Sequence, residues 1–144
     1  MTALTPHALE RFMRGQVRCW NAHDKAGFLA LYRDAAPNGL EIEYVGRAGQ
    51  ADGWFVIEEM YDKHNRQIRL EVVATLVNGS EAAAHHRNCM VGTDLVIESI
   101  ETYRFDAGRL CVRYFLKPPP PGPVDLAQFR GLAAAGPGDP VSAA

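Results

Sequence analysis

Glu101 is the residue of this chain best placed to do chemistry. It lies in residues 95–105, a run rich in β-branched and aromatic residues that predicts a strand. Side chains alternate along a strand, so Glu101 shares a face with Ser99 and Tyr103. If that face is buried, the charged form is disfavoured and the carboxyl group becomes a proton donor at neutral pH. If it is exposed, Glu101 is an ordinary surface carboxylate, and the pattern leaves both interpretations open.

The adjacent histidines His85 and His86 point to opposite faces of another predicted strand. An imidazole with an ordinary pKa near 6.5 suits general acid or base chemistry, although a hydrogen-bonded core histidine fits the same pattern for His86. No His-x-x-x-His or Glu-x-x-His pattern occurs at helical spacing, and Cys19, Cys89 and Cys111 form no Cys-x-x-Cys pair. We therefore expect no metal site and no disulfide framework.

The composition is that of a soluble globular domain, with 47 % hydrophobic and 22 % charged residues. No apolar run approaches the roughly 20 residues of a membrane span. A formal charge of -2 and a pI of about 6.2 give no electrostatic footprint for nucleic acid or an anionic membrane. Small, roughly neutral molecules are the expected partners. The first residues lack the basic and apolar regions of a secretion signal, which predicts a cytoplasmic protein.

Three helices are predicted in the first half of the chain. Thr5 before a proline is typical of a helix start, and apolar residues recur at helical spacing over residues 6–21. Asp24 is the expected N-cap of a second, short helix. Asp52 is the expected N-cap of a third, which follows a glycine-rich loop at residues 46–53 that could also cover a pocket mouth.

The rest of the domain is predicted as strands. These are expected at residues 40–45, 68–77, 82–91, 95–105 and 109–117. Asn78-Gly79 and the three residues 106–108 are typical hairpin turns. Helices followed by an antiparallel meander predict an α+β domain over residues 1–117.

Residues 118–144 form a Pro/Gly/Ala-rich extension of this domain. The prolines that open it cannot donate into a strand ladder, so the last strand should end there. We expect one or two helical turns at residues 124–133 and a mobile tail from residue 134.

The order of these pieces resembles a known family. The matching pieces are Trp20-Asn21-Ala22-His23-Asp24 at the end of the first helix, Phe28-Leu29-Ala30-Leu31-Tyr32, a helix after a Gly-rich loop, and a meander containing residues 101–109. Together they resemble the ketosteroid isomerase and polyketide cyclase branch of the nuclear transport factor 2-like superfamily. The resemblance implies a cone-shaped α+β barrel, in which helices pack on a curved, mostly antiparallel sheet and enclose a cavity. That fold hosts enzymes and binding domains alike.

Residue by residue, the resemblance assigns Glu43 to the family's catalytic base and Glu101 to its second, proton-donating acid. This division of labour is the known pattern of ketosteroid isomerase. The tyrosine that the family places on the first helix falls at Gln16, and Tyr61 matches a tyrosine that supports it. Gln16 can donate a hydrogen bond but has no acidic proton, which argues against true steroid isomerase activity.

The same match, extended with the period of a strand, assigns further side chains to the cavity. They are Ala84, His86, Asn88 and Met90 on one strand, and Arg113, Phe115 and Lys117 on the last. With Tyr103 and Trp54 beside them, they indicate an oxygenated ring as the ligand, such as a hydroxylated aromatic or polyketide. Arg113 could instead neutralise Glu101 and keep it charged and structural.

The alternate side chains predict the outer face of the sheet. They are Ile100, Thr102, Arg104, Leu110, Val112, Tyr114 and Leu116. Such a face is too apolar to be left wet, so we expect a homo-oligomer, most simply a dimer, formed through it.

Two functions fit these residues. In the first, the domain is a cofactor-independent lyase, dehydratase or isomerase in which Glu43 removes a proton and Glu101 donates a hydrogen bond where charge develops. Tyr61 or His86 would assist the donor. In the second, side chains fill the cavity and the domain binds a ligand or a partner without catalysis. An open cavity that reaches both glutamates favours the first function, and a collapsed core the second.

Overall fold

A computed structural model describes residues 5–46 and 51–117 of the chain. The elements are α1 (Pro6–Asn21), α2 (Lys25–Ala35), β1 (Gly39–Tyr44), β2 (Ala51–Asp52), α3 (Gly53–His64), β3 (Ile68–Asn78), β4 (Glu81–Met90), β5 (Val96–Asp106) and β6 (Arg109–Leu116). The strands form one sheet in the order β2-β1-β6-β5-β4-β3. Neighbours are antiparallel except β1 and β6, which run parallel. The domain is α+β, as the sequence predicts.

The helices begin at their predicted capping residues. The Thr5 hydroxyl accepts a hydrogen bond from the N–H of Ala8 at 3.0 Å. Asp24 accepts from the N–H of Gly27 at 2.9 Å, and Asp52 caps α3 in a similar way. Each cap satisfies one of the N–H groups that the first turn of a helix leaves without an intrahelical partner.

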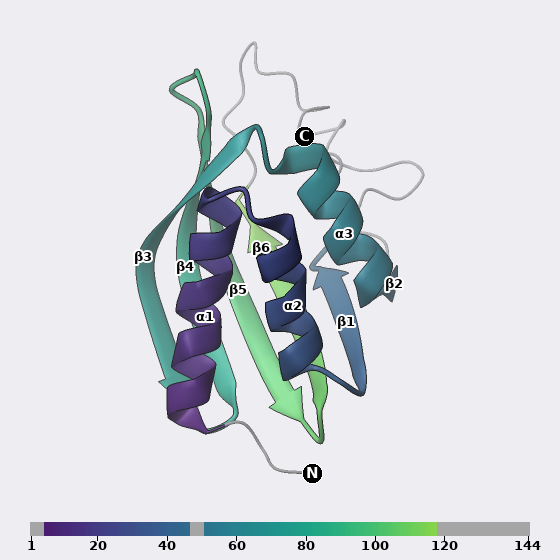
Figure 1. The fold of residues 1–144 in the computed structure, drawn as a ribbon. Helices are drawn as coiled ribbons and strands as arrows, with labels where there is room; N and C mark the ends of the chain where they lie inside the picture. The colour runs from purple at the N-terminus through teal and green to yellow at the C-terminus, as the bar shows by residue number, and fades with distance from the viewer. Residues whose placement is uncertain (1–4, 47–50, 118–144) are drawn as a thin grey trace.

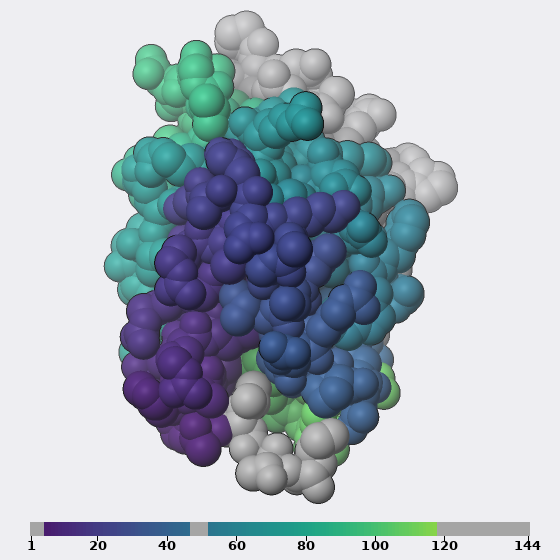
Figure 2. Space-filling view, viewed as in Figure 1, coloured from purple at the N-terminus to yellow at the C-terminus, as the bar shows by residue number. Residues whose placement is uncertain are grey.

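The helices cover one face of the curved sheet, which we call its inner face. In Figure 1, α1 and α2 lie in front of the long strands, and α3 lies near β1 and β2. Contacts of α1 with β3 and of α3 with β1 hold this layer in place. Viewed from the helical side, the helices hide much of the sheet (Figure 2). The core therefore lies between the helices and the inner face.

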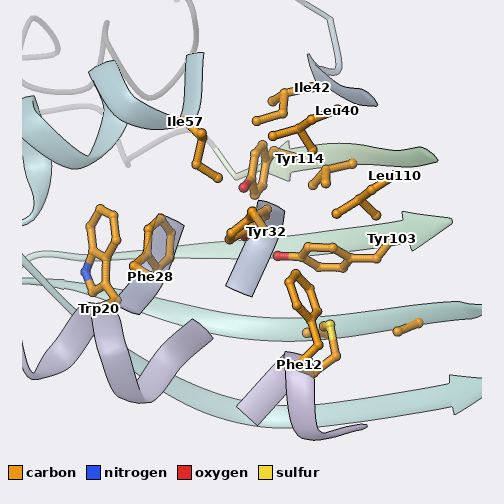
Figure 3. Packing of buried hydrophobic residues seen from close by; sticks show 14 of the residues in the cluster. Phe12, Trp20, Phe28, Tyr32, Leu40, Ile42, Ile57, Tyr103, Leu110 and Tyr114 are labelled. Atoms are coloured by element: carbon orange, nitrogen blue, oxygen red, sulfur yellow. The ribbon is translucent and has the colours of Figure 1, made fainter. Parts of the chain in front are cut away.

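Aromatic side chains dominate this core. The rings of Phe12, Tyr32, Tyr103 and Phe105 form one group, and those of Trp20, Phe28 and Tyr61 form a second, joined to the first through Tyr32. Their centroids lie 5.0–5.9 Å apart, mostly edge to face. Figure 3 shows this packing. Such ring pairs add about 0.5–1.5 kcal/mol each beyond the burial of their area.

The inner face of β6 differs from the prediction. The turn after β5 contains two residues, Ala107 and Gly108, with φ of 51° and 77°, and Asp106 pairs with Arg109 instead of belonging to a three-residue turn. A one-residue shift of register moves every side chain of a strand to the other face. As a result Leu110, Val112 and Tyr114 are buried, whereas Arg113, Phe115 and Lys117 are exposed.

The outer face is accordingly more polar than predicted. Ile100, Thr102 and Arg104 lie on it, but Leu110, Val112, Tyr114 and Leu116 do not. Ion pairs between β1 and β6 join Glu41 to Arg109 and Glu43 to Arg113, each at 3.0 Å. The predicted dimer stays a prediction, with less apolar surface to bury than expected.

Two predicted segments fall outside the described residues. They are positions 47–50 of the glycine-rich loop and the extension 118–144, including the helical turns expected at 124–133. Ala51 and Asp52, which the sequence assigned to the loop, form β2 and pair with β1. Within the described parts of the chain, no helix is long and apolar enough to cross a membrane.

Candidate functional site

Glu101 lies on the inner face of β5 and is 7 % exposed. Three side chains contact its carboxylate. Tyr103 donates to Oε1 at 2.5 Å, Ser99 donates to Oε2 at 3.3 Å, and His86 Nδ1 lies 3.0 Å from Oε2. A carboxylate offers about four lone-pair positions, so these contacts leave one position, on Oε1.

A chain of hydrogen bonds fixes the direction in which Tyr103 donates. Tyr32 donates to Gln16 Oε1, and Gln16 Nε2 donates to the hydroxyl oxygen of Tyr103 at 2.9 Å. The proton of Tyr103 is then directed at Glu101. Because Tyr103 and Ser99 both donate to Glu101, these contacts favour an ionised carboxylate over the proton-donating Glu101 that the sequence predicts.

Asn88 fixes Ser99 from the other side. Its Nδ2 donates to the backbone oxygen of Ile97 at 2.8 Å and to Ser99 Oγ at 2.9 Å. A backbone carbonyl can only accept, so the orientation of the amide is settled and Ser99 keeps its proton for Glu101.

His86 is 2 % exposed and forms a buried ion pair with Glu101 when it is protonated. Burial is the largest single influence on the pKa of His86 and lowers it. The hydrogen bond to Glu101 and the negative charge of Glu101 together outweigh burial, so the pKa of His86 is raised above 6.5. A raised pKa favours the protonated imidazole, which donates to Glu101 from Nδ1.

The same sheet carries a second histidine–glutamate pair on its outer face. His85 Nε2 lies 2.6 Å from Glu98 Oε1, and both side chains are 36 % exposed. Adjacent residues of β4 thus pair with two glutamates of β5 on opposite faces. The outer pair is a partly exposed counterpart of the inner one, and Glu98 also lies 3.5 Å from Arg87 Nε.

A cavity opens beside Glu101, between the helices and the inner face. Its lining is mostly apolar and aromatic and consists of Gln16, Trp20, Phe28, Tyr32, Tyr44, Met60, Ile68, Leu70, Asn88, Glu101, Tyr114 and Leu116. The hollow measures about 470 Å³ out to bulk solvent, of which about 40 Å³ can hold the centres of water molecules. Met60, Leu70 and Leu116 are partly exposed and form an apolar rim.

Glu43 does not reach this cavity. Strand β1 buries Leu40, Ile42 and Tyr44 and turns Glu43 to the outer face, where Arg113 Nε donates to it at 3.0 Å. The two glutamates therefore lie on opposite faces of the sheet. The predicted position of Glu43 is wrong, and Arg113 neutralises Glu43 instead of Glu101.

The other predicted residues divide between the site and the core. Gln16 and Asn88 line the cavity, and Tyr103 contacts Glu101 directly. Tyr61 and Met90 are buried in the core and are not among the described residues that line the cavity.

Trp54 also lies away from the cavity lining. It is partly buried at the start of α3, and the guanidinium of Arg33 lies 5.2 Å from its ring centroid. This is the packing role that a tryptophan near the start of an amphipathic helix often has.

Three tyrosines that sequence reasoning did not place at the site line the cavity. They are Tyr32, Tyr44 and Tyr114. Burial raises the pKa of all three, so they remain protonated donors. For Tyr44 a signal existed, because it alternates with Leu40 and Ile42 along a strand.

No three His, Cys, Asp or Glu side chains within residues 5–46 and 51–117 come together as metal ligands would. No family model and no curated protein matches the sequence. Similarity appears instead among solved structures.

Three solved structures illustrate this similarity. An NTF2-like protein of unknown function from Cytophaga hutchinsonii has 12 % identity and a TM-score of 0.59, with 81 % of this chain and 94 % of that chain covered. A SnoaL-like protein of unknown function from Burkholderia thailandensis has 21 % identity and a TM-score of 0.58, with 81 % and 98 % covered. A protein from Rhodopseudomonas palustris, provisionally named as an isomerase, has 16 % identity and a TM-score of 0.58, with 91 % and 99 % covered. At these identities the likeness shows the fold, and the chain has the nuclear transport factor 2-like fold.

Proposed function

We propose that this protein is a cofactor-independent acid/base enzyme, a lyase, dehydratase or isomerase, that acts on a small oxygenated cyclic molecule in the cavity. One observation carries the proposal: Glu101 is a buried carboxylate, oriented by three neighbours, that lines a mostly apolar cavity. A buried titratable group with a specific charge partner in a cleft is a candidate for catalysis. The isomerase name of one structural neighbour and the resemblance to the ketosteroid isomerase and polyketide cyclase branch support it.

In this proposal Glu101 is the general base. The remaining lone pair on Oε1 accepts a proton from the substrate, while His86 keeps the carboxylate ionised and Tyr103 and Ser99 hold its orientation. Donors that stabilise a carboxylate also hold it in one orientation, which suits a general base. Its targets would be a proton beside a carbonyl, removed while a donor stabilises the carbonyl oxygen, or the proton of a hydroxyl group. Isomerisation and dehydration begin with a proton beside a carbonyl, whereas retro-aldol-type cleavage begins with the proton of a hydroxyl group.

The experiment is thermal unfolding of the purified protein against steroids, phenolic aryl ethers, diarylpropanes, terpenoids and polyketide-like aromatics. A ligand at ~100 times its dissociation constant should stabilise the protein by about 2.7 kcal/mol. The ligand-induced rise in unfolding temperature should be smaller in Glu101→Gln and unchanged in the outer-face control Glu98→Gln. If Glu101→Gln does not fold, Glu101→Asp replaces it in the test, because its side chain is shorter by one methylene and moves the carboxylate away from the cavity. An equal shift in wild type and both Glu101 variants would contradict the proposal.

A non-catalytic ligand-binding or assembly domain is the second candidate. The small volume of the cavity favours it, because about 40 Å³ of water-accessible space admits a ring only if the rim moves. If no compound on the panel shifts the unfolding temperature, this candidate gains and protein partners become the next search.

A further inference from the structure

Tyr44 and Tyr114 form one wall of the cavity. They are register partners on the parallel strands β1 and β6, and their rings stack with centroids 5.1 Å apart and 29° between planes. They are 3 % and 6 % exposed, and both line the cavity with Glu101. Two phenol groups that act as a unit thus share the cavity with the carboxylate.

Neither hydroxyl proton goes to a charged acceptor. Tyr44 donates to Met60 Sδ at 3.2 Å, and a thioether is a weak acceptor. The Tyr114 hydroxyl lies beside the hydroxyl of Tyr32, which can accept its proton, and Tyr32 gives its own proton to Gln16 (Figure 3). A ligand oxygen that accepts from both hydroxyls therefore replaces only a thioether and a neutral phenol oxygen as acceptors.

Both groups stay protonated over the neutral range. Burial raises the pKa of Tyr44 and of Tyr114 above the ordinary value of 10, and the nearby Glu101 raises both further. By contrast, the donors around Glu101 are committed, because Tyr103 donates to the carboxylate and Gln16 donates to Tyr103.

We propose that Tyr44 and Tyr114 are a donor pair that binds the carbonyl or phenolic oxygen of the substrate. The proposal rests on the proposed function, in which Glu101 receives the proton, and it deepens that function by naming the group that holds the oxygen. Preorganised donors aimed at an oxygen where negative charge develops are a strong source of catalysis. The roles of the strands are then the reverse of the sequence-based expectation, because the base lies on β5 and the donors lie on β1 and β6.

The pair also defines the class of ligand. Two neutral hydroxyls suit an uncharged ketone or phenol, and the aromatic lining suits a ring. A free carboxylic acid would bring a second anion close to Glu101 in a buried space, which is costly. The inferred ligands are therefore uncharged cyclic or aromatic ketones and phenols.

The test uses acetophenone, whose carbonyl can accept a hydrogen bond but cannot donate one, and ethylbenzene, which lacks the oxygen. We expect acetophenone to bind more tightly, and the infrared stretch of its bound carbonyl to move to lower wavenumber than in an apolar solvent. Tyr44→Phe and Tyr114→Phe should each weaken its binding by about 10-fold and reverse part of the band shift. The control Tyr61→Phe, on a buried tyrosine outside the cavity lining, should leave both unchanged.

Three outcomes would overturn the pair: an unshifted carbonyl band, binding by the two variants equal to wild type, or no binding of acetophenone at all. A failure of the donor pair can be distinguished from a failure of the proposed function. Because the acetophenone carbonyl cannot donate to a carboxylate, a normal band shift in Tyr44→Phe and Tyr114→Phe together with lost ligand stabilisation in Glu101→Gln rejects the donor pair and leaves Glu101 in place.

Discussion

Glu101 and His86 depend on each other because both are buried. Removing one partner of a buried ion pair leaves an uncompensated charge and typically costs about 3–5 kcal/mol. In His86→Ala the carboxylate keeps Tyr103 and Ser99 as donors, so we expect a loss of about 2–4 kcal/mol in the free energy of unfolding. The matched change His85→Ala, on the exposed pair, should cost less than about 1 kcal/mol. Urea unfolding of both variants measures the difference, and equal losses would contradict a buried pair.

Two buried histidines predict opposite dependences of stability on pH. The pKa of His86 is raised in the folded state, so its stabilisation is fully present below pH 6.5 and is lost as the pH rises through the folded pKa. The pKa of His64 is lowered by burial, and neither ring nitrogen has a partner within the described residues. Below pH 6.5 the unfolded chain binds that proton more readily, so His64 costs stability as the pH falls.

Replacing each histidine separates the two effects. In His64→Leu the loss of stability at low pH should shrink, and the free energy of unfolding at neutral pH should rise by about 1–2 kcal/mol because unsatisfied polar atoms are removed. In His86→Ala the free energy of unfolding should instead decline less as the pH rises. Urea unfolding between about pH 5 and pH 9 tests both, and unchanged pH profiles would contradict the assignments.

At the scale of elements, α3 packs closely against β1 because Gly53 has no side chain at the contact. A Cβ at Gly53 would lie 2.4 Å from the backbone oxygen of Leu40, which cannot move aside as a side chain can. Gly53→Ala should therefore cost about 2–3 kcal/mol of unfolding free energy. Gly15→Ala in α1 is the control, since its Cβ would meet the end of the Leu31 side chain at 3.0 Å and alanine favours a helix by about 1 kcal/mol. Similar losses in the two variants would show that α3 is free to shift.

The elements themselves could be predicted from local signals. Thr5, Asp24 and Asp52 cap the three helices as expected, and the hairpin between β3 and β4 is also present. Its turn is Gly79-Ser80 instead of the predicted Asn78-Gly79, because Asn78 pairs with Glu81. The face of β6 could not be read in the same way, because it depends on whether the turn before it has two residues or three. The resemblance assigns Arg113 to the inner face, whereas the observed two-residue turn places Tyr114 there.

At the scale of the whole molecule, the site is assembled from segments far apart in the sequence. Gln16 on α1 contacts Tyr103 on β5, a separation of 87 residues. The period of a strand could place Glu101, His86 and Asn88 on one inner face. It could not show which helices close over that face or which donors they supply, since those contacts exist only in the folded chain.

The outer face bears on the assembly of the molecule. Ile100 and Phe115 are register partners there and are 43 % and 38 % exposed. We still expect a dimer through this face, which Ile100→Arg should dissociate by placing a charge in its apolar part. Sedimentation equilibrium measures the mass of both proteins, and a monomeric wild type at all concentrations would refute the dimer.

The most direct test of Glu101 as the functional carboxylate is turnover of whichever compound stabilises the wild-type protein. NMR would follow substrate and product with the wild type, Glu101→Gln and the outer-face control Glu98→Gln, after unfolding curves show that all three are folded. Loss of a general base should lower the rate by about 10²–10⁴-fold in Glu101→Gln and leave Glu98→Gln at the wild-type rate. Equal rates in all three proteins would contradict the account.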